Sequence, residues 1–446
     1  MISLAIGDIR HNPDYAWLTL RGGTLLPGLL GALYEPAAST DAVVQESITL
    51  TLKGTHAQMD LILNKLEDKL ALANRFTHEG VGFPHYLRVK ADPSGGYFYA
   101  RILEASLVPK ENSLAYYARG SLGVELTFLR PNYFDSDEVI LPLANSAFSG
   151  VTNGLPLLNH DDSAHDNAFL VAVDDLETDL PAPLRLEITN TYAGGALKDL
   201  SIGSFQYNLH NSLPLLVYEA EDGSGGSEQP SASASNGKFQ RFTWSAVGWT
   251  DLTDWSITPE DLNAYQGRMV TPLLRLASMH AHTGLLMKLG ITSGGISLYE
   301  GGEVAALAGK GYLVFPPLRL PCGELLGLTY PRAQQLHLHV YKAGSASVTL
   351  DLDDLLLIPQ DSFNQYLGLV PLMQNDRLVD DAFEGLSYGV QSDYELGTHI
   401  TLSRGHFIQP GHAACFMVFQ GDADGVAPID RAISVRAWYR QRRRIL

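Results

Sequence analysis

The acidic side chains best suited to hold a metal ion bracket one stretch of the sequence. Glu219 and Glu221 open this stretch, and Asp351 and Asp353 close it. If its first and last strands pair, as they do in a jelly roll, these carboxylates converge at one sheet edge. They would then offer the hard oxygen ligands that calcium prefers. The alternative is a set of ordinary solvated strand ends.

Aromatic side chains that could stack on a sugar ring lie inside the same stretch. Trp244, Trp249 and Trp255 follow one another closely, and Tyr265 comes soon after. Trp249 and Trp255 lie among Gly, Thr, Asp and Ser, which favours a loop, whereas Trp244 alternates like a buried strand residue. We therefore expect Trp249, Trp255 and Tyr265 to be the carbohydrate-binding candidates. A place in the core is the alternative for each.

The sequence lacks the short motifs of common enzymes. It has no GxSxG elbow, HExxH pair, P-loop or Rossmann glycine fingerprint. A glycosidase needs only two placed carboxylates, but no pair stands out among 49 acids. His337 and His339 alternate with apolar neighbours, which favours one polar strand face over a zinc site. We expect a non-enzyme that requires no cofactor, with calcium as the one candidate ion.

Composition indicates a β-rich protein of two to four domains. The chain has 446 residues, of which 45% are hydrophobic and 18% charged, with 42 Gly and 20 Tyr. Such a chain can bury several cores, and its residue types favour strands joined by tight turns. No apolar run reaches the roughly 20 residues of a membrane-spanning helix, so membrane insertion is not expected.

The balance of charges limits the partners. The formal net charge of −18 argues against nucleic-acid binding, which is driven by cations. Residues 431–446 hold six arginines and no acid, so the other 25 cations and 49 acids sum to −24.

The residues Met1 to Arg10 lack the features of a signal peptide, so we expect an outside-facing role to need lysis or assembly into a particle. Cys322 and Cys415 are far apart, which favours buried thiols over a disulfide or a metal pair.

Residues 1–145 predict strands and one helix. The segment 48–52 alternates with period two, and an amphipathic helix follows near 55–76, with Thr55 as its N-cap. Further strands are expected at 86–90, 97–109 and 121–129. A helix packed on an antiparallel sheet is a stable layer architecture, so we expect this region to be one domain.

The rest of the chain predicts β-sandwiches. Residues 146–217 are expected to contain an acidic connector and the first strands of a C-terminal sandwich. Residues 218–359 are expected to form an inserted jelly roll, with a flexible loop at 223–235 and strands that recur every 8–15 residues. Residues 360–446 would complete the C-terminal sandwich and end in the arginine-rich segment.

The pattern of residues 1–145 resembles the distal tail protein of siphophages. The likeness rests on the helix near 55–76, the run from Arg101 to Ser106, and the strand from Leu122 to Pro131. It implies a mainly β fold, in which a tail-tube-like β-sandwich with one flanking α-helix precedes jelly-roll sandwich domains. It also implies a hexameric ring at the virion tail tip, assembled in the host cytoplasm, with tail tube, tail hub and fibre proteins as partners. The cations Arg440, Arg442, Arg443 and Arg444 would dock on an acidic surface of a neighbouring subunit, or form a solvated end.

The bracketed stretch resembles the jelly-roll carbohydrate-binding modules. The shared features are the opening Glu219-Ala-Glu221 and the closing Asp351-Leu-Asp353, which in those modules supply a structural calcium. The resemblance implies a domain that contacts a host-surface glycan or a partner protein. A free carbohydrate-binding protein is the alternative, and a polysaccharide-cleaving enzyme is the second alternative.

Overall fold

The computed structural model divides the chain into two compact units. The first contains Met1–Val139, Leu176–Pro183 and Tyr439–Leu446, and the second contains Ile140–Asp175 and Leu184–Trp438. The structure describes residues 3–9, 17–36, 39–92, 94–110, 118–144, 150–151, 155–157, 168–171, 178–197, 200–207, 216–231, 234–265, 267–279, 284–306, 311–321, 333–359, 363–367, 371–391, 394–401, 405–410, 413–420, 423–424, 427–428 and 432–444. No helix in these ranges is long and apolar enough to cross a membrane.

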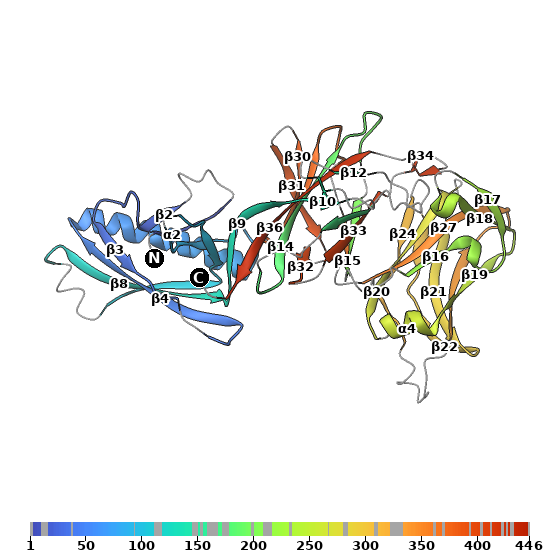
Figure 1. Cartoon of the computed structure of the whole chain (residues 1–446), viewed down its shortest axis with the longest axis horizontal. Coiled ribbons are helices and arrows are strands. Elements are labelled where there is room, and N and C mark those ends of the chain that lie inside the picture. The colour runs from blue at the N-terminus through green and yellow to red at the C-terminus, as the bar shows by residue number, and fades with distance from the viewer. Residues whose placement is uncertain are drawn as a thin grey trace. The chain divides into compact units, whose positions relative to one another are not determined.

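The first unit is a β-sandwich with one helix (Figure 1). One sheet has the strand order β3-β4-β8-β7, and the other is built by the antiparallel pairings β2–β1–β5–β6–β9. Its strands are β1 (Ser3–Gly7), β2 (Leu18–Arg21), β3 (Leu29–Leu33), β4 (Val43–Lys53), β5 (Tyr86–Lys90), β6 (Phe98–Arg101), β7 (Glu104–Pro109), β8 (Ser121–Pro131) and β9 (Phe134–Leu141). Buried side chains from both sheets and from the helix form a single core.

Helix α2 (His56–Glu79) confirms the predicted helix and its cap. Thr55 accepts a hydrogen bond from the backbone N–H of Gln58, and the Gln58 side chain accepts one from the Thr55 N–H, which together make a capping box. The helix ends at Gly80, whose φ of 67° places it in the left-handed region that favours glycine. The buried side chains recur at helical spacing and face the sheets: Met59, Ile62, Leu66, Leu70 and Ala73.

The predicted strand 97–109 is two strands because the chain changes sheets in its middle. β6 pairs with β5 in one sheet, whereas β7 pairs with β8 in the other. Ile102 donates its N–H to His85 O, and Leu103 donates to Leu129 O, so each side of the break keeps its own partner. The crossing ties the two sheets of the sandwich together.

Residues 216–359 of the second unit fold as a jelly-roll sandwich of two sheets. One has the order β17-β18-β27-β20-β24, with β16 also paired to β27 and β25 to β20; the other has the order β19-β26-β21-β22, with β23 paired to β21. The strands are β16 (Leu216–Glu219), β17 (Ser227–Pro230), β18 (Lys238–Trp244), β19 (Gly248–Ile257), β20 (Met269–Met279), β21 (Leu285–Ser293), β22 (Ile296–Glu300), β23 (Val304–Ala306), β24 (Tyr312–Val314), β25 (Leu318–Arg319), β26 (Gln334–Lys342) and β27 (Val348–Pro359). One apolar core lies between the sheets. The predicted mainly β, jelly-roll fold class is confirmed.

The flexible loop predicted at 223–235 is wrong in part. Ser227–Pro230 forms β17 and pairs with β18, and the short 3-10 helices η1 (Ala220–Asp222) and η2 (Ser235–Gly237) flank it. The small polar residues that suggested flexibility instead build tight turns, with Gly225 and Gly226 at positive φ. Helix α4 (Pro259–Tyr265) is the α-helix within the described part of the jelly roll.

Strands from before and after the jelly roll pair with one another in the second unit. β14 pairs with β29, and β15 pairs with both β28 and β33. The jelly roll is therefore inserted between strands of one β-structure. The described strands that follow β9 and lie outside the jelly roll are β10 (Leu143–Ala144), β11 (Gly150–Val151), β12 (Leu155–Leu157), β13 (Ala168–Val171), β14 (Ala182–Asn190), β15 (Leu200–Tyr207), β28 (Phe363–Leu367), β29 (Arg377–Asp381), β30 (Leu386–Gln391), β31 (Tyr394–Thr401), β32 (Phe407–Ile408), β33 (Ala413–Gln420), β34 (Ala423–Asp424), β35 (Ala427–Pro428) and β36 (Ile433–Arg443).

Candidate functional site

The first and last strands of the jelly roll pair with each other, as the predicted calcium site requires. β16 and β27 are antiparallel, with Glu219 opposite Asp354. A bulge then interrupts the pairing of β27 with β20: Leu274 lies opposite Leu355 and Leu276 opposite Leu352. One residue of β20, Arg275, therefore faces two residues of β27. Because a bulge breaks the period-two alternation, Asp353 and Asp354 can both approach this arginine.

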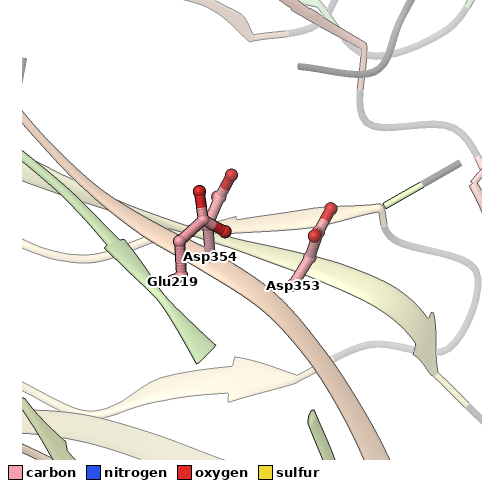
Figure 2. A group of neighbouring side chains, drawn as sticks. All are labelled: Glu219, Asp353 and Asp354. Carbon is pink, nitrogen blue, oxygen red and sulfur yellow. The ribbon is translucent and has the colours of Figure 1, made fainter. Parts of the chain in front are cut away.

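Three carboxylates gather at the bulge. Ligand oxygens of Glu219, Asp353 and Asp354 all lie within 4.8 Å of one another, and Figure 2 shows the three groups side by side. Arg275 Nη2 lies 3.0 Å from Asp353 Oδ2, and its Nη1 lies 3.3 Å from Asp354 Oδ2. Ser235 donates its N–H to Asp353 Oδ1 at 2.8 Å and its hydroxyl to Glu219 Oε1 at 2.9 Å. We call these three acids with Arg275 the acid cluster.

The acid cluster can hold a divalent cation by charge and donor type. Three carboxylates and one guanidinium leave two negative charges, and the remaining oxygens are the hard donors that calcium takes. Arg275 already does part of what a bound metal ion would do, because its positive charge lies against both Asp353 and Asp354. Either arrangement clamps the strand that opens the jelly roll to the strand that closes it.

Two of the four predicted calcium ligands lie outside the acid cluster. Asp351 pairs in register with Arg241, which donates from Nε and Nη2 to its two oxygens at 2.8 Å each. Glu221 accepts from Asn236 Nδ2 at 3.2 Å. Sequence reasoning chose Asp351 and missed Asp354, because strict alternation puts neighbouring residues on opposite faces. The β16–β27 register places Asp354 opposite Glu219, and the bulge against β20 lets Asp353 approach the same arginine.

The predicted aromatic residues separate into buried and exposed positions. Trp255 lies on β19, is only 2% exposed, and donates its Nε1–H to Glu219 O at 2.8 Å. It is a core residue, so the expectation of a loop position and a sugar platform is corrected. Trp249 is also on β19 but is 40% exposed and contacts Tyr341 of β26. The side chain of Tyr265 lies outside the described residues.

The arginine-rich end is used in part within its own chain. Arg442 donates to both oxygens of Asp135, at 2.7 and 3.1 Å, and its guanidinium lies over the ring of Tyr133. Arg440 donates to Ser136 O at 2.9 Å and is 8% exposed. This corrects the expectation of docking on a neighbour for these two side chains. Arg443 is half-buried and Arg444 exposed.

A serine, a histidine and an aspartate also meet in the second unit, but in its interior. Ser204 Oγ lies 3.3 Å from His406 Nδ1, and His406 Nε2 lies 3.6 Å from Asp380 Oδ2. Asp380 also accepts from Tyr366, Asn364 and Ser387. The serine, histidine and aspartate are all buried, so a substrate cannot reach them. Burial lowers the pKa of His406 despite the attraction of Asp380. We interpret the group as a structural network.

Comparisons with known proteins add only distant likenesses. No protein-family model and no curated protein matches the chain. A family 35 carbohydrate binding module from Clostridium thermocellum aligns over 32% of this chain and 99% of its own, with 13% identity and a TM-score of 0.21. An exo-beta-1,3-galactanase from Phanerochaete chrysosporium covers 71% of this chain and 82% of its own, with 12% identity and a TM-score of 0.20. A structure of infectious bursal disease virus Gt strain covers 83% and 85%, with 10% identity and a TM-score of 0.19.

Proposed function

We propose that this chain is a structural subunit of a phage tail tip. Its first unit forms a ring with further copies, joining the tail tube to the tip, and its jelly roll faces the host surface or a partner protein. The role is one of assembly and binding, without catalysis. The fold of the first unit supports this proposal, because a helix-flanked sandwich is what the resemblance to distal tail proteins implies.

The observation that carries the proposal is the apolar edge strand of the first unit. β3 pairs with β4, and within the described residues no strand is paired to its other side. Leu30 and Leu33 of β3 are 59% and 60% exposed. Open edges with exposed leucines favour association with another chain, and they are costly to leave in water. A head-to-tail contact that covers β3 and closes on itself makes a ring.

The oligomeric state of the purified full chain tests the proposal. Mass photometry and negative-stain microscopy should show closed rings, with six copies as the resemblance implies. Leu33→Glu should break the rings into smaller species, because it places a charge in the covered edge. Ile296→Glu is the matched control. It adds the same charge at an equally exposed apolar position of the jelly roll and should leave the rings intact.

Two outcomes count against the proposal. One is a wild-type chain that stays monomeric at high concentration. The other is a ring that both variants leave unchanged, because assembly would then use a different surface. Thermal unfolding of each variant guards against misreading a folding defect as an assembly defect.

A further inference from the structure

The outer face of the second jelly-roll sheet carries an ordered set of polar and aromatic side chains. On β26, the residues Leu336, Leu338 and Val340 are buried, while the residues between them face outward. The pairing registers set these outward residues in rows across three strands. Trp249, Tyr341 and Leu286 form one row, and Asp251, His339 and Lys288 form the next. We call these two rows, with His337 and Glu300, the outer sheet face.

The first row is an aromatic platform. The rings of Trp249 and Tyr341 lie 5.5 Å apart and are tilted by 53°. Lys288 Nζ lies 4.4 Å from the centre of the Trp249 ring, which positions the indole by a cation–π contact. An indole that is partly exposed and fixed by two neighbours loses little conformational freedom when a ligand stacks on it.

The second row supplies hydrogen-bonding groups beside the platform. Asp251 Oδ2 lies 3.2 Å from His337 Nδ1, and Asp251 Oδ1 lies 3.7 Å from His339 Nδ1. Lys288 donates to Glu300 of β22. Asp251 and Glu300 are both more than half exposed, so oxygens of both acids are within reach of a ligand.

Gly290 makes room for this arrangement. A Cβ at Gly290 would lie 3.0 Å from His339 Nε2, which is a tight contact that the ring would have to relieve by a shift of a few tenths of an ångström. Gly290 also lies opposite both His337 and Glu300 in the two registers. A side chain here would crowd the His339 ring and shift it slightly.

The charges of the outer sheet face select the class of ligand. Lys288 is offset by Glu300. Burial, as the largest effect, lowers the pKa of His339, so this ring is neutral at neutral pH beside the anionic Asp251. The face therefore has no excess positive charge with which to hold a phosphate or sulfate. An aromatic platform next to uncharged donors and exposed acceptors matches a ligand with an apolar ring face and hydroxyl groups at its rim.

We infer that the outer sheet face binds neutral glycans. A pyranose ring stacks on Trp249 and Tyr341, and its hydroxyls exchange hydrogen bonds with Asp251, His339 and Glu300. This inference gives a ligand class to the jelly roll of the proposed function. It rests on that proposal only for the source of the glycan, which is the host surface. The sequence pattern singled out Trp249 and placed His337 and His339 on one polar face, but only the strand registers bring them beside Tyr341, Asp251 and Lys288.

Affinity electrophoresis of the full chain tests the inference. Gels contain one neutral polysaccharide each (galactan, xylan, mannan or a β-glucan), and parallel gels contain dextran sulfate. The wild-type chain should be retarded by at least one neutral polymer and not by dextran sulfate. Trp249→Ala and Tyr341→Ala should each weaken binding by about tenfold or more, as expected for an aromatic anchor. Val247→Ala, an exposed apolar position outside the rows, should bind like the wild type.

A second variant tests the polar row without touching the aromatic pair. A side chain at position 290 crowds the His339 ring, so Gly290→Val should shift that ring and weaken binding, while the tryptophan fluorescence of the unliganded protein stays close to that of the wild type. The inference is overturned if no neutral polymer retards the chain, if only dextran sulfate does, or if Trp249→Ala binds unchanged. Mass photometry of the same samples keeps the two proposals apart. If the chain binds glycan but forms no rings, the proposed assembly is wrong and the glycan site stands. If it forms rings but binds no glycan, the glycan site is wrong and the proposed assembly stands.

Discussion

Arg442 and Asp135 form a two-point ion pair although 307 residues separate them in the sequence. Both belong to the first unit, which the end of the chain therefore helps to build. Asp135 is buried, and this burial raises the pKa of its carboxyl group even though Arg442 and Arg440 pull it down. The arginine is thus what allows a charged carboxylate to remain inside the sandwich.

Arg442→Ala should destabilise the first unit strongly. Removing one partner of a buried ion pair leaves the other charge without compensation, which costs about 3–5 kcal/mol. Urea unfolding monitored by tryptophan and tyrosine fluorescence would measure this loss. The matched control is Arg444→Ala, because Arg444 is exposed; its effect should stay within about 0.5 kcal/mol. Equal stability of the two variants would show that the pair contributes nothing.

Thr55→Ala should weaken helix α2 by about 1 kcal/mol. The variant removes the hydroxyl that accepts from the Gln58 N–H and so opens the capping box. Thr55→Ser keeps an oxygen at the same place and serves as the control. Thermal unfolding followed by circular dichroism should show Thr55→Ser near the wild type and Thr55→Ala below it. The reverse order would argue that the methyl group, not the hydroxyl, matters.

The sequence predicted the elements whose pattern is local. Helix α2 has both its cap and its apolar stripe in adjacent residues, so it could be located within a few positions. Strands such as β5 and β8 were placed correctly because alternation and turn residues define them without reference to distant partners. Such elements can be predicted because the residues that determine them are close together in the sequence.

Positions that depend on a distant strand could not be predicted. Asp354 joins the acid cluster because the β16–β27 register places it opposite Glu219, and the bulge against β20 brings Asp353 and Asp354 to the same arginine. Trp255 looked like a loop residue among its polar neighbours, yet pairing of β19 with β26 turns it into the core. Tyr341 was not among the predicted aromatic residues, and only the β19–β26 register places it beside Trp249. Each outcome is set by register, which composition does not encode.

Calcium should raise the melting temperature of the jelly roll, and EDTA should lower it. A ligand that binds only the folded state adds about 2.7 kcal/mol when present at a hundredfold excess over its dissociation constant. Asp354→Asn removes one charge from the acid cluster and should abolish the shift. Asp351→Asn is the control, since it loses the pair with Arg241 but leaves the acid cluster complete. A wild-type chain indifferent to calcium would mean that Arg275 alone balances the acids.

The stability of the second unit should fall as the pH drops below about 6.5. Burial lowers the pKa of His406 from its ordinary value of 6.5, so the folded state holds this ring neutral. Between that value and the lowered one, the unfolded chain binds a proton that the folded chain does not. Each such proton makes the free energy of unfolding decrease by about 1.4 kcal/mol per pH unit of acidification. Asp380 opposes the shift, because its charge favours the protonated ring, but burial is the larger effect.

His406→Gln isolates this contribution from that of the other histidines. Glutamine keeps a hydrogen-bonding side chain beside Ser204 and Asp380 but cannot titrate. Urea unfolding at a series of pH values from 7.5 to 5 would give the slope for each protein. The variant should be less stable at neutral pH yet lose less stability on acidification. Parallel slopes for the wild type and His406→Gln would show that His406 takes up its proton in the folded state, and the network around Asp380 would then have to accept a charged ring.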